Sequence, residues 1–254
     1  MKLIRKILVK VVGIKMYLLI VSKIYINLIR LGFFKSKHPE LHFLKSIVRK
    51  DDVCVDIGAN LGYYSSQLVR IAHQGKVFAV EPIPLFTSIW KKNVKGSNVT
   101  LHEVALGNEE KTVRMAIPIR NGVVRHGLTK VIGEDNQDDS FLEFDVQMKV
   151  GNELFSALEK LNYLKCDVEG FERFVFRALD DVLVKYKPLI QVELNGTDNR
   201  NDVYNQLTGN GFTAYVLKRG GLIPVLKSEL SNYTQDFYFV HGDKYADYAS
   251  IISR

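Results

Sequence analysis

Hydrophobic residues along this chain fall into short apolar runs that alternate with segments of helical spacing. From residue 50 onward the runs are short and rich in β-branched side chains, as is typical of buried strands. The predicted strands are Val53–Ile57, Val77–Val80, Val99–His102, Tyr163–Cys166, Leu189–Val192, Thr213–Leu217 and Phe237–Val240. The predicted helices between them are Tyr64–Ala72, Leu85–Val94, Glu172–Leu179 and Val203–Asn210. This alternation predicts an α/β, doubly wound fold with a mainly parallel sheet and right-handed crossovers.

One segment interrupts the alternation. Thr112–Ile117 and Phe141–Val150 have the pattern of two paired strands, and a polar, glycine-containing stretch separates them. We therefore expect an inserted hairpin with a long loop, a place where substrate recognition often resides. Arg120, Arg125 and Lys130 in this stretch either bind an anionic group of the substrate or are solvated loop charges.

The N-terminal segment differs from the rest in charge. Residues 1–39 carry nine Lys and Arg and no acid, so the overall charge of +7 leaves −2 for residues 40–254. We divide the chain into a basic, apolar helical arm (1–39) and one domain (40–254). The longest uncharged stretch of the arm, Met16–Ser22, is far shorter than the roughly 20 residues of a spanning helix. A cleaved signal peptide is also disfavoured, because no small-residue cleavage pattern follows.

Two interpretations of the arm remain open. It is either a helix lying on an anionic membrane surface or a helical cap on the domain, with Gly13 expected to interrupt the helix. The near-neutral domain disfavours nucleic acid as a partner. Cys54 and Cys166 lie inside apolar strand runs, which predicts buried, unpaired thiols and suits a reducing compartment. We expect a cytoplasmic protein. If the arm lies on a membrane, we expect the protein to be peripheral on the inner face of the cell membrane.

The strongest chemical signal is the run Asp56-Ile-Gly-Ala-Asn-Leu-Gly62, which ends a strand and opens a helix. Gly58 and Gly62 let the backbone approach a ligand, and the helix N-terminus offers free N–H groups. A dinucleotide site would have glycine where Asp56 stands, since an acid repels a pyrophosphate. An acid at this strand end attracts a cationic amino group instead.

A second acid follows at the end of the next strand. Glu81, before Pro82, can accept hydrogen bonds from both ribose hydroxyls of a nucleoside. Together the two motifs predict a nucleoside-cofactor site.

Further acids are expected at the same edge of the sheet. Asp167 and Glu169 follow one strand, and Glu193 and Asn195 follow the next. Carboxylates gathered at one cleft repel each other, so at least one should have a raised pKa or a cation partner. Helix capping by Asp167 and Glu169 is the structural alternative.

These blocks, in this order, resemble the FkbM-type family of class I methyltransferases between Asp52 and Val240. The resemblance is carried by DIGANLGYYS (56–65), AVEPIP (79–84), NVTLHEVALG (98–107), YLKCDVEGFE (163–172) and LIQVEL (189–194). It implies a Rossmann-like, seven-stranded sheet of order 3-2-1-4-5-7-6 and S-adenosylmethionine (SAM) as cofactor. It also implies methylation of an oxygen on a sugar, glycan or other small molecule. The implied cofactor-binding residues are Asp56, Gly58, Asn60, Gly62, Tyr63, Glu81, Pro82, Ala105, Leu106 and Asp167.

Methyl transfer to oxygen needs a group that removes the acceptor proton. Our candidate bases are Asp167, Glu169 and His126. A Mg²⁺ ion held by Asp167, Glu193 and Asn195 is a further option, because some class I O-methyltransferases place a metal at these strand ends. The rival functions are methylation of nucleic acid and a membrane-associated module that binds the cofactor without turnover.

Overall fold

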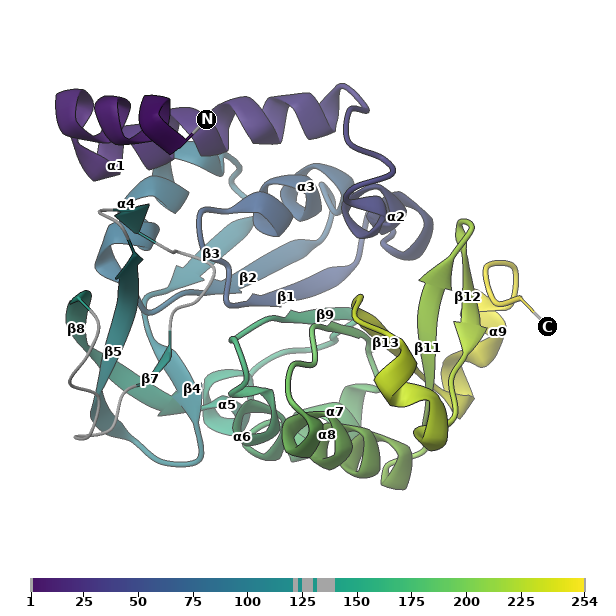
Figure 1. The fold of residues 1–254 in the computed structure, drawn as a ribbon. Coiled ribbons are helices and arrows are strands. Elements are labelled where there is room, and N and C mark those ends of the chain that lie inside the picture. Colours follow the sequence, from purple (N-terminus) through teal and green to yellow (C-terminus); the bar gives the residue numbers. More distant parts are fainter. Residues whose placement is uncertain (1, 121–122, 125–129, 132–139, 254) are drawn as a thin grey trace.

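The core of the computed structural model is an eight-stranded sheet with helices on both faces (Figure 1). The structure describes residues 2–120, 123–124, 130–131 and 140–253. The sheet has the order β3-β2-β1-β9-β10-β13-β11-β12. Its strands are β1 (Val53–Ile57), β2 (Lys76–Val80), β3 (Val99–His102), β9 (Tyr163–Cys166), β10 (Leu189–Val192), β11 (Phe212–Lys218), β12 (Gly221–Pro224) and β13 (Phe237–His241).

Seven of these strands run in the order that the family resemblance implies, and β12 is an additional strand at the edge. The expected number of seven was therefore one too low. β12 pairs antiparallel with β11 through a tight turn in which Arg219 and Gly220 both have positive φ (51° and 82°). Such a turn matches the twist of the two strands. The five strands from β3 to β10 are parallel, so their carboxyl ends meet at one edge.

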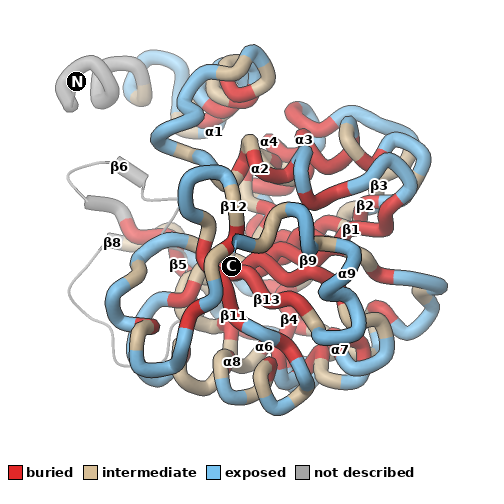
Figure 2. Tube along the Cα trace, turned by 90° about the vertical axis from the view of Figure 1, so that its right-hand side faces the viewer, coloured by how far each residue is buried: buried red, intermediate tan, exposed pale blue. Residues whose placement is uncertain are grey.

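Helices cover both faces of this sheet (Figure 1). On one side lie α2 (Pro39–Ile47), α3 (Tyr63–Ile71) and α4 (Pro84–Asn93), and on the other lie α6 (Glu172–Arg177), α7 (Asp180–Tyr186) and α8 (Thr197–Gly209). The remaining short helices are α5 (Gly151–Leu154), α9 (Tyr245–Tyr248) and the 3-10 turns η2 (Lys227–Asn232) and η3 (Gly242–Lys244). The central strands are buried on both faces (Figure 2). This explains why their sequences are apolar runs rather than alternating patterns. Cys54 and Cys166 are buried free thiols, as predicted.

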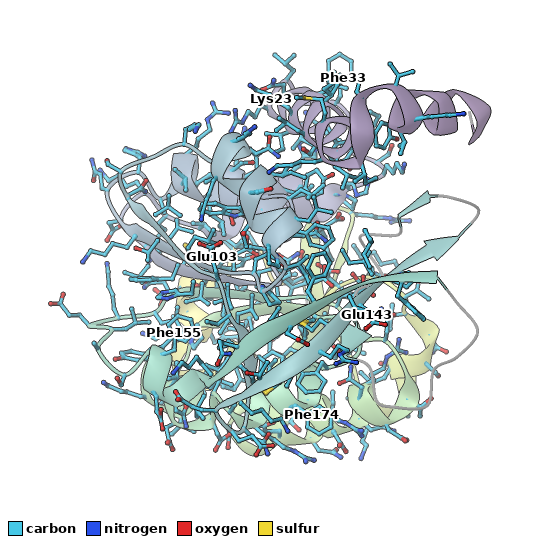
Figure 3. All side chains as sticks on the ribbon, turned by 90° about the vertical axis from the view of Figure 1, so that its left-hand side faces the viewer. Lys23, Phe33, Glu103, Glu143, Phe155 and Phe174 are labelled. Atoms are coloured by element: carbon cyan, nitrogen blue, oxygen red, sulfur yellow. The ribbon has the colours of Figure 1, made fainter. Side chains whose placement is uncertain are left out.

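The predicted hairpin is confirmed as part of a second, smaller sheet of order β4-β8-β5-β6, with β7 also paired to β5. Its strands are β4 (Ala105–Gly107), β5 (Lys111–Arg120), β6 (Val123–Val124), β7 (Lys130–Val131) and β8 (Ser140–Val150). β5 and β8 pair antiparallel from Lys111 with Met148 to Ile119 with Ser140. Glu143 of β8, which is labelled in Figure 3, pairs with Ala116 of β5. His126, one of our candidate bases, and Arg125, which we left as either an anion-binding residue or a solvated loop charge, lie outside the described residues, as do the side chains of Arg120 and Lys130.

The arm forms a long helix, α1 (Lys2–Arg30), that kinks at Gly13 (φ 76°, ψ 159°), where we expected an interruption. Its second half packs on α3 and α4 and buries Leu18, Ser22, Ile26 and Ile29. Asn93 Nδ2 donates to Ser22 Oγ and to the carbonyl of Leu61, both at 2.8 Å. The arm therefore caps the domain. Val9–Arg30 is also long and apolar enough to cross a membrane by length and composition.

Candidate active site

The loop after β1 contacts the end of β2 and the residue that follows β9. The N–H groups of Gly58 and Ala59 both donate to the carbonyl of Val80, at 3.0 Å each. Gly58 has a φ of 76°, and a Cβ atom there would lie 1.8 Å from the carbonyl oxygen of Asp167. Only glycine permits this approach, because it tolerates positive φ and has no Cβ. The loop therefore brings three strand ends to one place.

Glu81 ties the loop to the end of β2. One carboxylate oxygen, Oε2, accepts from the N–H of Asn60 (2.8 Å), and Oε1 accepts from the N–H of Ile83 (2.9 Å). The side chain is only 4% exposed, and burial raises its pKa to about 7. Each oxygen keeps a further lone pair for a ligand hydroxyl.

Asp56 is the second buried carboxylate of this region. Its Oδ2 accepts a 2.5 Å hydrogen bond from Ser65 Oγ, which in turn accepts from Trp90 Nε1 (3.0 Å). Burial raises the pKa of Asp56 to about 6. Asp56 lies in β1, two residues before the loop that Glu81 holds, and both acids line the cleft that Gly58 also lines.

The cleft consists of three adjoining chambers, and Gly58 lines all of them. The apolar chamber, about 310 Å³, is lined by Val104, Ala105, Leu106, Met115, Met148 and Phe171, among others. The middle chamber, about 160 Å³, is lined by Asn60, Tyr63, Glu81, Pro82, Asp167 and Glu169, among others. The polar chamber, about 420 Å³, is lined by His38, Glu40, Asp56, Lys165, Asp167, Glu193 and Asp236, among others. The cleft thus changes from apolar to charged along its length.

A buried lysine lies at the polar chamber. The Nζ of Lys165, whose side chain is 2% exposed, lies 3.4 Å from Asp167 Oδ2 and 3.9 Å from Asp236 Oδ2. Burial lowers the pKa of Lys165, but the carboxylates of Asp167 and Asp236 outweigh it and raise the pKa above its usual value. Gln191 Nε2 completes the cluster by donating to Asp236 Oδ2 (2.6 Å). A buried amide thus fixes Asp236 beside the lysine.

The predicted acids divide between the chambers. Asp167 lines the middle and polar chambers, whereas Glu169 lines the apolar and middle chambers. Burial, with Asp167 and Glu193 nearby, raises the pKa of Glu169 to about 8. The expected carboxylate repulsion is therefore present. Glu172 has a structural role, since it accepts from the N–H groups of Val168 and Gly170.

The residues predicted to hold Mg²⁺ do not fit that ion. Asp167 and Glu193 reach the polar chamber, but Asn195 is exposed and is not among its lining residues. The ammonium of Lys165 already supplies a cation beside Asp167. Over the part of the chain that the structure describes, no group of three or more His, Cys, Asp or Glu side chains is arranged to hold a metal ion.

Most predicted cofactor residues line the cleft, and one does not. Gly62, with a φ of 90°, turns the chain into α3, and a Cβ atom there would lie 2.6 Å from Val94 Cγ2. Its role is therefore close packing rather than lining a chamber. The sequence reasoning missed Lys165, Asp236, His38 and Glu40. The available signal for Lys165 was a charge inside an apolar strand run; the other three lie outside any strand motif.

The seven strands, the glycine turn and the acid at the end of β2 define a class I methyltransferase. A family model described as a methyltransferase FkbM domain matches residues 56–213, and the chain belongs to this family.

Two curated methyltransferases are similar over part of their length. Methyltransferase 1 of Beauveria bassiana is 27% identical over 148 residues, covering 52% of this chain and 59% of that protein. Methyltransferase sdnD of Sordaria araneosa is 24% identical over 155 residues, covering 50% and 60%. The similarity thus spans less than two thirds of either relative. The crystal structure of the FkbM methyltransferase from Methylobacillus flagellatus KT matches with a TM-score of 0.51 at 12% identity, covering 76% of this chain and 44% of that chain. At this identity the likeness shows a shared fold.

Proposed function

We propose that this protein transfers the methyl group of SAM to an oxygen of a sugar, glycan or other small molecule. The observation that carries the proposal is the convergence of Asp56, Gly58 and Glu81 on one cleft with an apolar end and a polar end. Such a cleft, at the carboxyl ends of β1 and β9 where the strand order reverses, suits a nucleoside joined to a charged amino acid.

The residues along the cleft fit the successive parts of SAM, in the order adenine, ribose and methionine. The apolar chamber, with Ala105 and Leu106, suits a purine. Glu81 has free lone pairs for the ribose hydroxyls, and the carboxylate of Asp56 suits the ammonium of the methionine moiety. When bound, SAM supplies a methyl carbon that is activated by the neighbouring sulfonium.

The polar chamber suits an acceptor with several hydroxyl groups. Asp167, Glu193, Asp236 and Glu40 offer carboxylate oxygens there, and hydroxyls are good donors to such oxygens. This favours an oxygen of a sugar or a similar polyhydroxylated molecule as the acceptor.

We assign removal of the acceptor proton to His38. Its Nδ1 lies 3.2 Å from Oε1 of Glu40, and both residues line the polar chamber. A carboxylate that holds Nδ1–H leaves the lone pair on Nε2, where it can receive a proton. Asp167 is already paired with the ammonium of Lys165, at 3.4 Å from Oδ2 to Nζ. Asp167 therefore orients the acceptor, and Glu169 belongs to the cofactor side of the cleft.

The proposal is tested by calorimetry with SAM and by a screen with methyl-labelled SAM over free sugars, lipid-linked sugars and phenols. We expect SAM binding and a labelled oxygen in a product. His38→Asn should keep SAM affinity and lose roughly 10²–10⁴-fold in turnover. His73→Asn is the matched control, because His73 is exposed and outside the cleft. Absence of SAM binding, or label on nitrogen or carbon, would contradict the proposal.

A further inference from the structure

The outward side of α1 presents several apolar side chains beside the exposed Lys23 and Asn27, although α1 already buries an apolar side on the domain. Met16, Ile20 and Ile24 recur every four residues and are 45%, 45% and 55% exposed. Residues at this spacing lie on one face of a helix. Leu31 and Phe33, which follow the helix end at Arg30, are also exposed, at 74% and 55%. We call these five residues the outer face of α1.

Exposed apolar side chains concentrate in the arm that carries this face. Among the side chains that the structure describes, nine of the twelve large exposed hydrophobics lie between residues 11 and 34. The other three, Val184, Leu226 and Tyr245, are distant from the arm in sequence. Water-soluble helices carry polar residues on their solvent side, and a contiguous apolar patch marks an interaction site.

The charges around the face indicate what covers it. Residues 1–39 contain no acid, and Lys10, Lys15, Lys23, Lys35 and Lys37 are exposed. Lys23 and Phe33 both lie on the side of α1 away from the sheet (Figure 3). A second copy of this chain, docked by the same face, would bring the same positive charge. An anionic bilayer instead offers an apolar layer bordered by phosphates, which suits apolar side chains flanked by lysines.

The packing of α1 favours a helix in the plane of the membrane surface rather than across it. Leu18, Ile26 and Ile29 are at most 4% exposed against the domain, and Ser22 accepts its hydrogen bond from Asn93. Spanning a bilayer would expose all of these contacts to lipid and leave the Asn93 amide without this acceptor. We propose that the outer face of α1 docks the protein on an anionic membrane surface.

If the protein has the proposed function, docking also indicates which kind of acceptor molecule reaches the polar chamber. Val21, 42% exposed on α1, and Tyr25 line the polar chamber. The chamber is therefore next to the docked face. An acceptor with a polar hydroxylated head and a lipid anchor reaches this chamber from the membrane surface.

The test is cosedimentation of the full-length chain with vesicles, without SAM or acceptor. We expect binding to vesicles of phosphatidylcholine with phosphatidylglycerol, weaker binding at high salt, and little binding to phosphatidylcholine alone. The double variant Ile20→Glu/Ile24→Glu should lose at least ~10-fold in affinity, because two apolar side chains are replaced by acids. Val184→Glu/Leu226→Glu is the matched control, since it changes two exposed apolar residues elsewhere and should bind like the wild type.

Several outcomes would overturn the docking proposal. These are a wild-type protein that stays in the supernatant, or an Ile20→Glu/Ile24→Glu variant that binds like the control. Light scattering that shows a wild-type dimer and a monomeric double variant would assign the face to a second copy. Resistance to alkaline extraction would indicate a spanning helix. If the double variant does not fold, Lys23→Glu/Lys35→Glu gives the same test through charge. Calorimetry with SAM, measured separately, reports on the proposed function alone.

Discussion

Replacing Gly58 with alanine should distort the cofactor cleft while leaving most of the fold intact. The new Cβ would lie 1.8 Å from the carbonyl oxygen of Asp167 and 2.9 Å from its carbonyl carbon. Both neighbours are backbone atoms, so no side chain can rotate away. The loop and the end of β9 must therefore separate by more than about 1 Å to reach ordinary contact distance.

Two terms set the magnitude. An alanine at a φ of 76° costs roughly 1 kcal/mol, and overpacking against a fixed backbone adds roughly 1–3 kcal/mol. Unfolding by urea should therefore show a loss of about 2–4 kcal/mol in the free energy of unfolding. Because the displaced loop carries Asn60 and directly follows the strand end that holds Asp56, we expect SAM affinity to fall by about 100-fold or more, as for other ~1 Å misplacements in active sites.

Gly220→Ala is the control that measures the cost of an alanine at positive φ without the cost of overpacking. Gly220 has a φ of 82° in the turn between β11 and β12, and a Cβ there meets nothing within 4 Å. This control should lose roughly 1 kcal/mol of stability and keep wild-type SAM affinity by calorimetry. A folded Gly58→Ala protein that binds SAM within threefold of the wild type would refute the placement of the cofactor.

Three further predictions follow from the charges of the cleft. Lys165→Met should destabilise the fold by about 3–5 kcal/mol in urea unfolding, because it leaves Asp167 and Asp236 without their buried cation. Adding Asp236→Asn should recover part of this loss. Equal stability of the single variant and the wild type would exclude a structural ion cluster. Glu81 has a folded pKa of about 7, raised above its ordinary 4.5, so the folded state binds its proton more tightly than the unfolded state. The cost of holding Glu81 ionised in the folded state is complete above pH 7 and disappears toward pH 4.5. The free energy of unfolding should therefore rise by about 2 kcal/mol from pH 8 to pH 5.5. Asp56 acts in the same direction, and Glu81→Gln should flatten the dependence of stability on pH. Exhaustive chelation should leave turnover unchanged, since Lys165 occupies the cation position beside Asp167; turnover restored by added Mg²⁺ would show that this reasoning is wrong.

The sequence by itself determined the local elements and the cofactor motifs. The strands β1, β3, β9 and β10 have the predicted bounds. β1, β9 and β10 are buried on both faces, which favours a mainly apolar run, whereas the edge strand β3 is only partly buried. The glycine turn and Glu81 were equally visible, because they follow strand ends directly. The sequence did not reveal β12, since four residues paired by a hairpin turn carry too weak a pattern.

Only the tertiary structure decided which distant groups share the polar chamber. His38 and Glu40 come from the junction of α1 and α2, Asp236 precedes the last strand, and Lys165 lies within β9, yet all four line one cavity. No spacing along the chain encodes this, because it depends on how α1 packs across α3 and α4 and on which strands are neighbours in the sheet. The same packing decided that α1 has one buried and one exposed apolar face. Periodicity alone shows that a helix is apolar, but burial depends on its partner.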